Sequence, residues 1–161
     1  MSEDHVGAAA PELLALASVA RQLAEQGRFD DARRLLEGLV ILEPASAYFH
    51  TCLGCLYMSM DRSEEALASF DEALKHDASD VVAHTYSGEL KLESGQLDDA
   101  LEHFGRAAAG DAEGMNRHAN RARTLSLIAE RIRAETKGKT TDAVREFVRN
   151  ALKAESDDGA R

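Results

Sequence analysis

Small and apolar side chains recur along this chain at a constant interval. Three alanines, Ala32, Ala66 and Ala100, mark this interval of 34 residues. A large apolar side chain follows each alanine by four residues, and a small one precedes it by twelve; these positions are Leu36, Phe70, Phe104, Ala20, Gly54 and Gly88. A period of this length indicates one supersecondary unit present in three copies.

Within each copy, the apolar spacing is typical of two amphipathic helices joined by a short turn. In the second copy it predicts one helix at about 47–60 and another at about 63–76. Glycine in the middle of a helix costs about 1 kcal/mol relative to alanine. Its recurrence at Gly54 and Gly88 therefore predicts that two helices approach each other closely at these points.

Two further amphipathic helices are expected after the third copy. The first, over 115–134, would cover the apolar face that the last unit of a repeat array leaves open. The second spans 139–154, and residues 1–10 and 155–161 are expected to be disordered. The predicted fold is all-α, with helix-pair units at about 13–46, 47–80 and 81–114, a capping helix and an additional C-terminal helix.

Charge is distributed unevenly along the 161 residues. Residues 1–114 carry 8 basic and 22 acidic side chains, whereas residues 115–161 carry 11 basic and 7 acidic ones. The acidic part disfavours nonspecific nucleic-acid binding. The basic end either contacts an anionic partner or lies against the acidic part of the same protein. A nucleic-acid regulator that uses an arginine-bearing helix at 117–133 is the alternative that this leaves open.

The sequence predicts a soluble, cytoplasmic protein without membrane insertion. Its densest apolar stretch, Leu35 to Leu42, is short and contains Glu37 and Gly38; a membrane span needs about 20 apolar residues. The opening residues, Met-Ser-Glu-Asp-His, lack the pattern of a signal peptide. Two free cysteines fit a reducing compartment.

Residues that could carry chemistry are present, but their spacing favours packing. Cys52 and Cys55 form a C-x-x-C pair inside a predicted helix, away from the helix N-terminus that would lower a thiol pKa. A structural zinc site would need a second ligand pair. His50 and His84 are separated by the repeat interval, so they occupy the same position in successive copies. We therefore predict no catalytic residues, no metal site and no cofactor.

The pattern Leu53, Gly54, Tyr57, Ala66, Phe70 and Ala73 resembles a tetratricopeptide repeat, and the third copy matches it through Gly88, Gly95, Ala100, Phe104 and Ala107. The resemblance covers about residues 13–114. It implies a right-handed superhelical array of three helix hairpins, whose first helices line a concave surface. The residues it places there, which form the candidate partner-binding site, are Leu14, Ala17, Arg21, Tyr48, Thr51, Cys55, Met58, Val82, Thr85, Glu89 and Leu92. This surface is either open to a partner or covered by the protein's own termini.

A narrower resemblance follows from the stretch that begins at Gly27 and reaches Pro44, together with Tyr48, Phe49, Leu53 and Gly54. It is similar to the opening of bacterial type III secretion class II chaperones. The resemblance implies a chaperone that holds an apolar Pro-x-Leu-x-x-Pro-like segment of a secreted translocator in its concave groove. It also implies association of two copies through N-terminal elements.

Other members of the repeat family hold acidic tails of heat-shock proteins with Lys, Arg and Asn side chains. At the matching positions this chain has Arg21 as its one cation, and Glu89 would repel a carboxylate. This argues against a heat-shock co-chaperone. The alternative function is a repeat scaffold or adaptor in a bacterial assembly or signalling complex, which would bind a folded partner.

Overall fold

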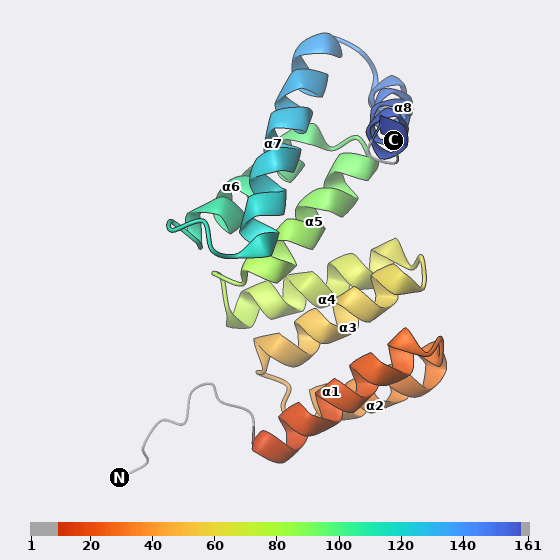
Figure 1. Cartoon of the computed structure of the whole chain (residues 1–161), viewed down its shortest axis with the longest axis vertical. Coiled ribbons are helices and arrows are strands. Elements are labelled where there is room, and N and C mark those ends of the chain that lie inside the picture. Colours follow the sequence, from red (N-terminus) through yellow and green to blue (C-terminus); the bar gives the residue numbers. More distant parts are fainter. Residues whose placement is uncertain (1–9, 159–161) are drawn as a thin grey trace. The chain divides into compact units, whose positions relative to one another are not determined.

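The structure is a computed structural model that describes residues 10–158, and every regular element in that range is an α-helix (Figure 1). The helices are α1 (Pro11–Glu25), α2 (Phe29–Leu42), α3 (Ala47–Ser59), α4 (Ser63–His76), α5 (Val81–Glu93), α6 (Leu97–Ala109), α7 (Arg117–Glu135) and α8 (Thr141–Asp158). They belong to two compact units, unit 1 (residues 1–83) and unit 2 (residues 84–161), and the division falls inside α5.

Unit 1 is built from two helix pairs, α1 with α2 and α3 with α4. Ala20 and Ala32 are fully buried where α1 meets α2, because their small side chains let the two helices approach. Leu36 and Leu39 of α2 pack in the same core as Phe49 of α3, so this core joins the two pairs. As a result, α1 and α3 contact each other on one side of the unit, in front of α2 and α4 in Figure 1.

In the second and third helix pairs, α3 with α4 and α5 with α6, a close approach is made at a glycine. A Cβ on Gly54 of α3 would lie 2.5 Å from Cε1 of Phe70 in α4, and a Cβ on Gly88 of α5 would lie 2.5 Å from Cε1 of Phe104 in α6. Both phenylalanines are fully buried. Each ring therefore occupies the space that a larger residue at the glycine would fill. The close approach predicted from the recurrence of glycine is confirmed once in each unit.

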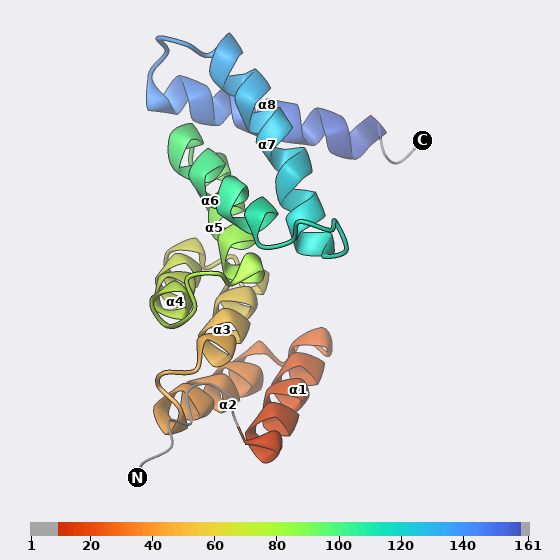
Figure 2. The same ribbon diagram turned by 90° about the vertical axis from the view of Figure 1, so that its left-hand side faces the viewer.

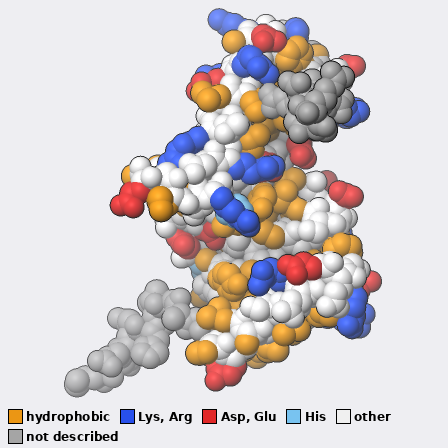
Figure 3. Space-filling view, viewed as in Figure 1, with side chains coloured by type: hydrophobic (Ala, Val, Ile, Leu, Met, Phe, Trp, Pro, Cys, Tyr) orange, Lys and Arg blue, Asp and Glu red, His pale blue; other side chains and the backbone are white. Residues whose placement is uncertain are grey.

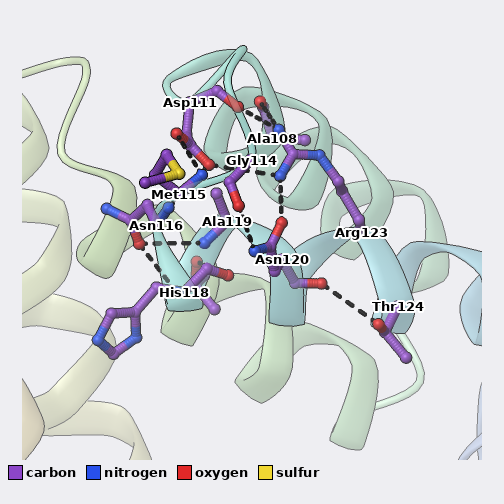
Figure 4. A network of polar contacts seen from close by, with 11 residues as sticks. Ala108, Asp111, Gly114, Met115, Asn116, His118, Ala119, Asn120, Arg123 and Thr124 are labelled. Atoms are coloured by element: carbon purple, nitrogen blue, oxygen red, sulfur yellow. Dashed lines mark hydrogen bonds and ion pairs between the residues drawn. The ribbon is translucent and has the colours of Figure 1, made fainter.

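Unit 2 continues with α7, which packs along α6. The helix begins where it does because the Asn116 side chain accepts hydrogen bonds from the backbone N–H groups of His118 and Ala119, at 2.8 and 3.3 Å (Figure 4). These bonds satisfy donors that the first turn of a helix leaves unpaired. The capping helix predicted over 115–134 therefore spans Arg117–Glu135.

The last helix, α8, lies crosswise to α7 (Figure 2) and docks on the turn between α5 and α6. Gly95 in that turn has φ +80°, and a Cβ there would lie 3.1 Å from the Thr141 carbonyl oxygen and 3.2 Å from the Arg145 nitrogen. Arg145 Nε donates to the Ser94 carbonyl at 3.3 Å, and Val144 and Val148 are buried. The first half of α8 is thus anchored on the turn between α5 and α6 of the same unit.

The ends of the chain differ in part from expectation. The additional helix predicted over 139–154 begins at Thr141, after Thr140 Oγ1 accepts from the Ala143 N–H at 3.4 Å. It continues to Asp158, so the disordered tail predicted at 155–161 is wrong for residues 155–158. The remaining residues of that tail, 159–161, lie outside the described residues, as does the predicted disordered segment 1–10 apart from Ala10.

We expect Gly54→Ala to lower the free energy of unfolding by about 3 kcal/mol, because the new methyl group overlaps the buried Phe70 ring. The matched control is Gly38→Ala in α2, where an added Cβ meets nothing within 4 Å. There the higher helix propensity of alanine should raise stability by up to about 1 kcal/mol.

Urea unfolding followed by circular dichroism measures both changes. Adding Phe70→Leu to Gly54→Ala should recover part of the loss, since the smaller side chain leaves room for the methyl group. Equal stability of the Gly54→Ala and Gly38→Ala proteins would contradict the steric explanation.

Candidate functional site

The structure separates the predicted partner-binding residues by exposure. Three are exposed: Leu14 at 40%, Tyr48 at 50%, and Arg21, whose side chain is 71% exposed. Three are half-buried, namely Cys55, Met58 and Val82, and five are buried, namely Ala17, Thr51, Thr85, Glu89 and Leu92. The side chains that a partner could reach most easily therefore lie on α1 and α3 of unit 1.

The surface formed by Leu14, Arg21, Tyr48, Cys55 and Met58 is named here the α1–α3 face. Figure 3 shows hydrophobic side chains interspersed with charged ones over this side of unit 1. The Tyr48 ring packs at 5.7 Å from the ring of the fully buried Phe49, which fixes the start of α3 in the core. The Tyr48 side chain thus projects from a rigid base.

Two thiols lie beneath the exposed part of this face. Burial raises the pKa of the Cys55 thiol to about 12, and it also raises the pKa of the Cys52 thiol. The nearby Cys52 in turn raises the pKa of Tyr48, while Arg21 acts in the opposite direction. Because catalytic or redox cysteines need a low thiol pKa, this environment fits the packing role predicted for the pair.

Two buried threonines, one in each unit, donate hydrogen bonds to groups of the same unit that lie further along the chain. Thr51 Oγ1 of α3 donates to Asp80 Oδ2 at 2.6 Å, and Asp80 Oδ1 accepts the N–H groups of Val82 and Ala83 at the start of α5. In unit 2, Thr85 Oγ1 of α5 donates to the His118 carbonyl in the first turn of α7 at 3.2 Å. Both hydroxyls are therefore used inside the protein.

Glu89 is likewise engaged within unit 2. Its carboxylate accepts two hydrogen bonds from Arg121 of α7, at 2.5 and 2.9 Å, and its side chain is only 11% exposed. The negative charge that the sequence placed on the partner-binding surface is thus compensated by a cation 32 residues further along the chain. Leu92, one turn later on α5, is 1% exposed.

The arginines of α7 make further contacts with acidic residues of unit 2. Arg133 lies 3.2 Å from Asp98 of α6, and Arg123 lies 3.5 Å from Asp111. Arg123 also donates to the Ala108 carbonyl at 2.9 Å and to the Asp111 carbonyl (Figure 4). The Asp111 carboxylate holds the loop by accepting from the Met115 and Asn116 N–H groups, which lower its pKa. Part of the basic end therefore lies against acidic residues of the same protein, as one of the two predicted alternatives states.

The histidines occupy packing positions. His50 Nε2 lies 2.9 Å from the Pro44 carbonyl, and its ring stacks on His76. In unit 2, the Nδ1 atoms of His84 and His103 lie 3.0 Å apart. Within residues 10–158, no group of three or more His, Cys, Asp or Glu side chains is arranged to hold a metal ion.

The sequence analysis did not identify the groups that bond to Thr51, Thr85 and Glu89. One signal in the sequence could have pointed to α7. His118 follows His84, and Ala122 follows Gly88, by the same interval that separates the repeat copies. The period therefore runs on into α7, and it marks that helix as a continuation of the repeat pattern. Asp80 and Arg121 have no like residue 34 positions earlier, so the repeat pattern could not identify them as partners of Thr51 and Glu89.

A family model described as a tetratricopeptide repeat matches residues 52–116. The matched range begins inside α3 and ends at Asn116, the residue that caps α7. The first copy of the repeating pattern precedes this range and keeps its small and apolar positions at Ala20, Ala32 and Leu36.

Several solved structures share this fold. The Yersinia enterocolitica type III secretion chaperone SycD, in complex with a peptide of the translocator YopD, matches with a TM-score of 0.68 and 19% identity, over 76% of this chain and 95% of SycD. PcrH, in complex with the chaperone-binding region of PopB, matches with a TM-score of 0.65 and 25% identity, over 73% and 97%. The Sgt2 TPR domain from Aspergillus fumigatus matches with a TM-score of 0.69 and 16% identity, over 83% and 87%.

The predicted all-α repeat fold is thus confirmed, together with its resemblance to tetratricopeptide repeats and to type III secretion chaperones. In the described part of the chain, none of the helices has the length and apolar composition of a membrane span.

Both cysteines of the repeat region should react slowly with iodoacetamide at pH 8. A pKa raised above its usual value leaves less thiolate, which is the reactive form. For Cys55, isolated by Cys52→Ser, we expect a rate at least tenfold below that of the urea-unfolded protein, increasing as the pH rises towards 12. Mass spectrometry of the alkylated peptide measures this rate. A folded-state rate equal to the unfolded one would contradict the burial of this thiol.

Removing the cation that pairs with Glu89 should destabilise unit 2. We expect Arg121→Ala to lower the free energy of unfolding by about 1–3 kcal/mol, because it leaves a buried carboxylate without its hydrogen bonds. Arg106→Ala is the matched control: Arg106 pairs with Glu102 at 2.8 Å, but both side chains are exposed, so the loss should stay below about 1 kcal/mol. Urea titration distinguishes the two, and equal losses would refute the role of burial.

Proposed function

We propose that this protein is a chaperone that binds an extended, apolar segment of a secreted partner protein on the α1–α3 face. The observation that carries the proposal is the likeness to SycD, solved with a peptide of the translocator YopD, and to PcrH, solved with the chaperone-binding region of PopB. Binding of this kind needs no chemistry, and it would keep the apolar segment from aggregating before export.

The side chains of the α1–α3 face suit an apolar ligand. Leu14 and Tyr48 are exposed, and Cys55 and Met58 are half-buried beside them. Tyrosine is a frequent anchor at interfaces, and the flexible methionine side chain adapts to irregular apolar shapes. Fully burying one aliphatic side chain of the partner would contribute about 1.5–3 kcal/mol.

The charge on this face also supports an apolar segment rather than an acidic one. Arg21 is the one cation among the eleven candidate residues, and it lies 4.0 Å from Glu25 on the same helix. The cation of this face thus already has a carboxylate of its own helix as a partner. Asp80, whose charge acts on the Cys55 thiol, is already hydrogen-bonded to Thr51 and to the start of α5.

The face is preformed, because the inner sides of both helices that carry it are packed in the core of unit 1. Ala17 and Ala20 bury the inner side of α1, and Phe49 and Leu56 bury that of α3. The cost of ordering therefore falls on the partner segment alone.

An interface to a folded partner or to a second copy is the second candidate function. Exposed large apolar side chains outside the α1–α3 face favour it: Leu16 and Val19 on α1, and Ile41 and Leu42 at the end of α2, are 40–79% exposed. These residues could support association of two copies through the first helix pair while the α1–α3 face holds the secreted partner.

Replacement of Met58 should decide whether the α1–α3 face binds the partner. We expect a fluorescent peptide with a Pro-x-Leu-x-x-Pro pattern to bind with micromolar affinity, and Met58→Glu to weaken binding at least tenfold, because it places a charge in an apolar contact. Fluorescence anisotropy measures both affinities.

The matched control is Met115→Glu, the same substitution at a methionine that is 84% exposed in unit 2. It should leave the affinity unchanged. Equal weakening by both variants, or no binding by the folded wild-type protein, would overturn the proposal.

A further inference from the structure

Unit 2 contains a cavity that the proposed function does not use. It has a volume of about 450 Å³, opens to solvent, and is lined by Glu93 at the end of α5 and by Val148, Arg149, Leu152 and Lys153 of α8. This volume lies within the range of about 300–1,000 Å³ that is usual for ligand sites. We call it the α5–α8 pocket.

The position of α8 determines the walls of this pocket. The start of α8 is held by the close packing of Thr141 and Arg145 on Gly95 and by the Arg145–Ser94 hydrogen bond. One turn later Val148 is 1% exposed, whereas Leu152 is only half-buried. The apolar stripe of α8 is therefore covered at one end and left partly open where the pocket lies.

The lining combines an apolar surface with a net positive charge. Among the lining residues that the structure describes, Val148 and Leu152 are apolar, and the charged groups are the cations Arg149 and Lys153 and the carboxylate of Glu93. Arg149 is exposed and lies one helical turn from Lys153. The α1–α3 face has one cation, Arg21, among its five residues, so it is the presence of two cations one turn apart that distinguishes the pocket.

We propose that the α5–α8 pocket binds an aliphatic side chain of a partner peptide whose neighbouring residue carries a carboxylate. The aliphatic group would lie against the half-buried Leu152, above the buried Val148, and the carboxylate would pair with Arg149. This inference rests on the proposed function in one respect, since it takes the ligand to be an extended protein segment. It assigns to α8 a part in recognition beyond its packing on unit 2.

The test uses the full chain, labelled with ¹⁵N and at its methyl groups, and titrated with N-acetyl-Leu-Asp-amide at millimolar concentration. Nuclear magnetic resonance detects binding this weak and locates it. We expect shifts at Val148, Arg149 and Leu152, and about two- to fivefold weaker binding of N-acetyl-Leu-Asn-amide, because an exposed ion pair contributes modestly.

Substitutions at partly or fully exposed positions distinguish loss of the pocket from loss of folding. Leu152→Asp should abolish the shifts, while the matched control Leu127→Asp, at a leucine of α7 that is 69% exposed, should leave them in place. Arg149→Glu replaces an exposed side chain, and it should reverse the preference so that N-acetyl-Leu-Lys-amide binds better than the Asp probe.

The remaining outcomes distinguish failure of the pocket from failure of the proposed function. Shifts confined to Tyr48, Cys55 and Met58 would overturn the pocket while supporting the α1–α3 face. Shifts in neither place would also overturn it, and the peptide titration with Met58→Glu would still decide the proposed function. An unchanged preference in Arg149→Glu would refute the role of charge.

Discussion

The contact between a mid-helix glycine and a fully buried phenylalanine determines how closely the helices of a pair can pack. Gly54 and Phe70 make this contact in unit 1, and Gly88 and Phe104 make it in unit 2. The distance between paired helices sets where the next helix can dock, and so it sets which side chains of the first helices reach the surface. On α3, Tyr48 is exposed whereas Thr51, three residues later, is buried.

The sequence allowed the fold to be predicted well because its strongest constraint is periodic. A glycine that must accept an aromatic ring has to recur with that ring, and Gly54, Phe70, Gly88 and Phe104 do so at the repeat interval. The candidate site was less accessible to such reasoning. A repeat position places Thr85 or Glu89 on a side of a helix, but it does not tell which later segment covers that side. The carbonyl of His118 and the guanidinium of Arg121 do so, from α7.

The charge imbalance along the chain has a structural explanation in part. Arg121, Arg123 and Arg133 of α7 lie against Glu89, Asp111 and Asp98, which belong to the acidic first part of the sequence. A basic helix that follows an acidic repeat pattern can thus dock on it through ion pairs as well as through its apolar stripe. The same ion pairs reduce the basic charge that α7 could offer to nucleic acid, which weakens the case for the nucleic-acid alternative.

The hydroxyl of Thr51 has a counterpart in Thr85, but in the first copy the equivalent position is Ala17. A hydroxyl that donates to a carboxylate oxygen requires a narrow range of distances and angles between the two groups. A methyl group makes dispersion contacts that have no such directional requirement. In the described part of the chain, no hydrogen bond or ion pair joins α1 to α3, while Tyr57 of α3 is bonded to Glu37 of α2. Of the two helices that carry the α1–α3 face, α3 is therefore positioned by a directional hydrogen bond as well as by packing, whereas α1 is held against α3 by apolar packing alone.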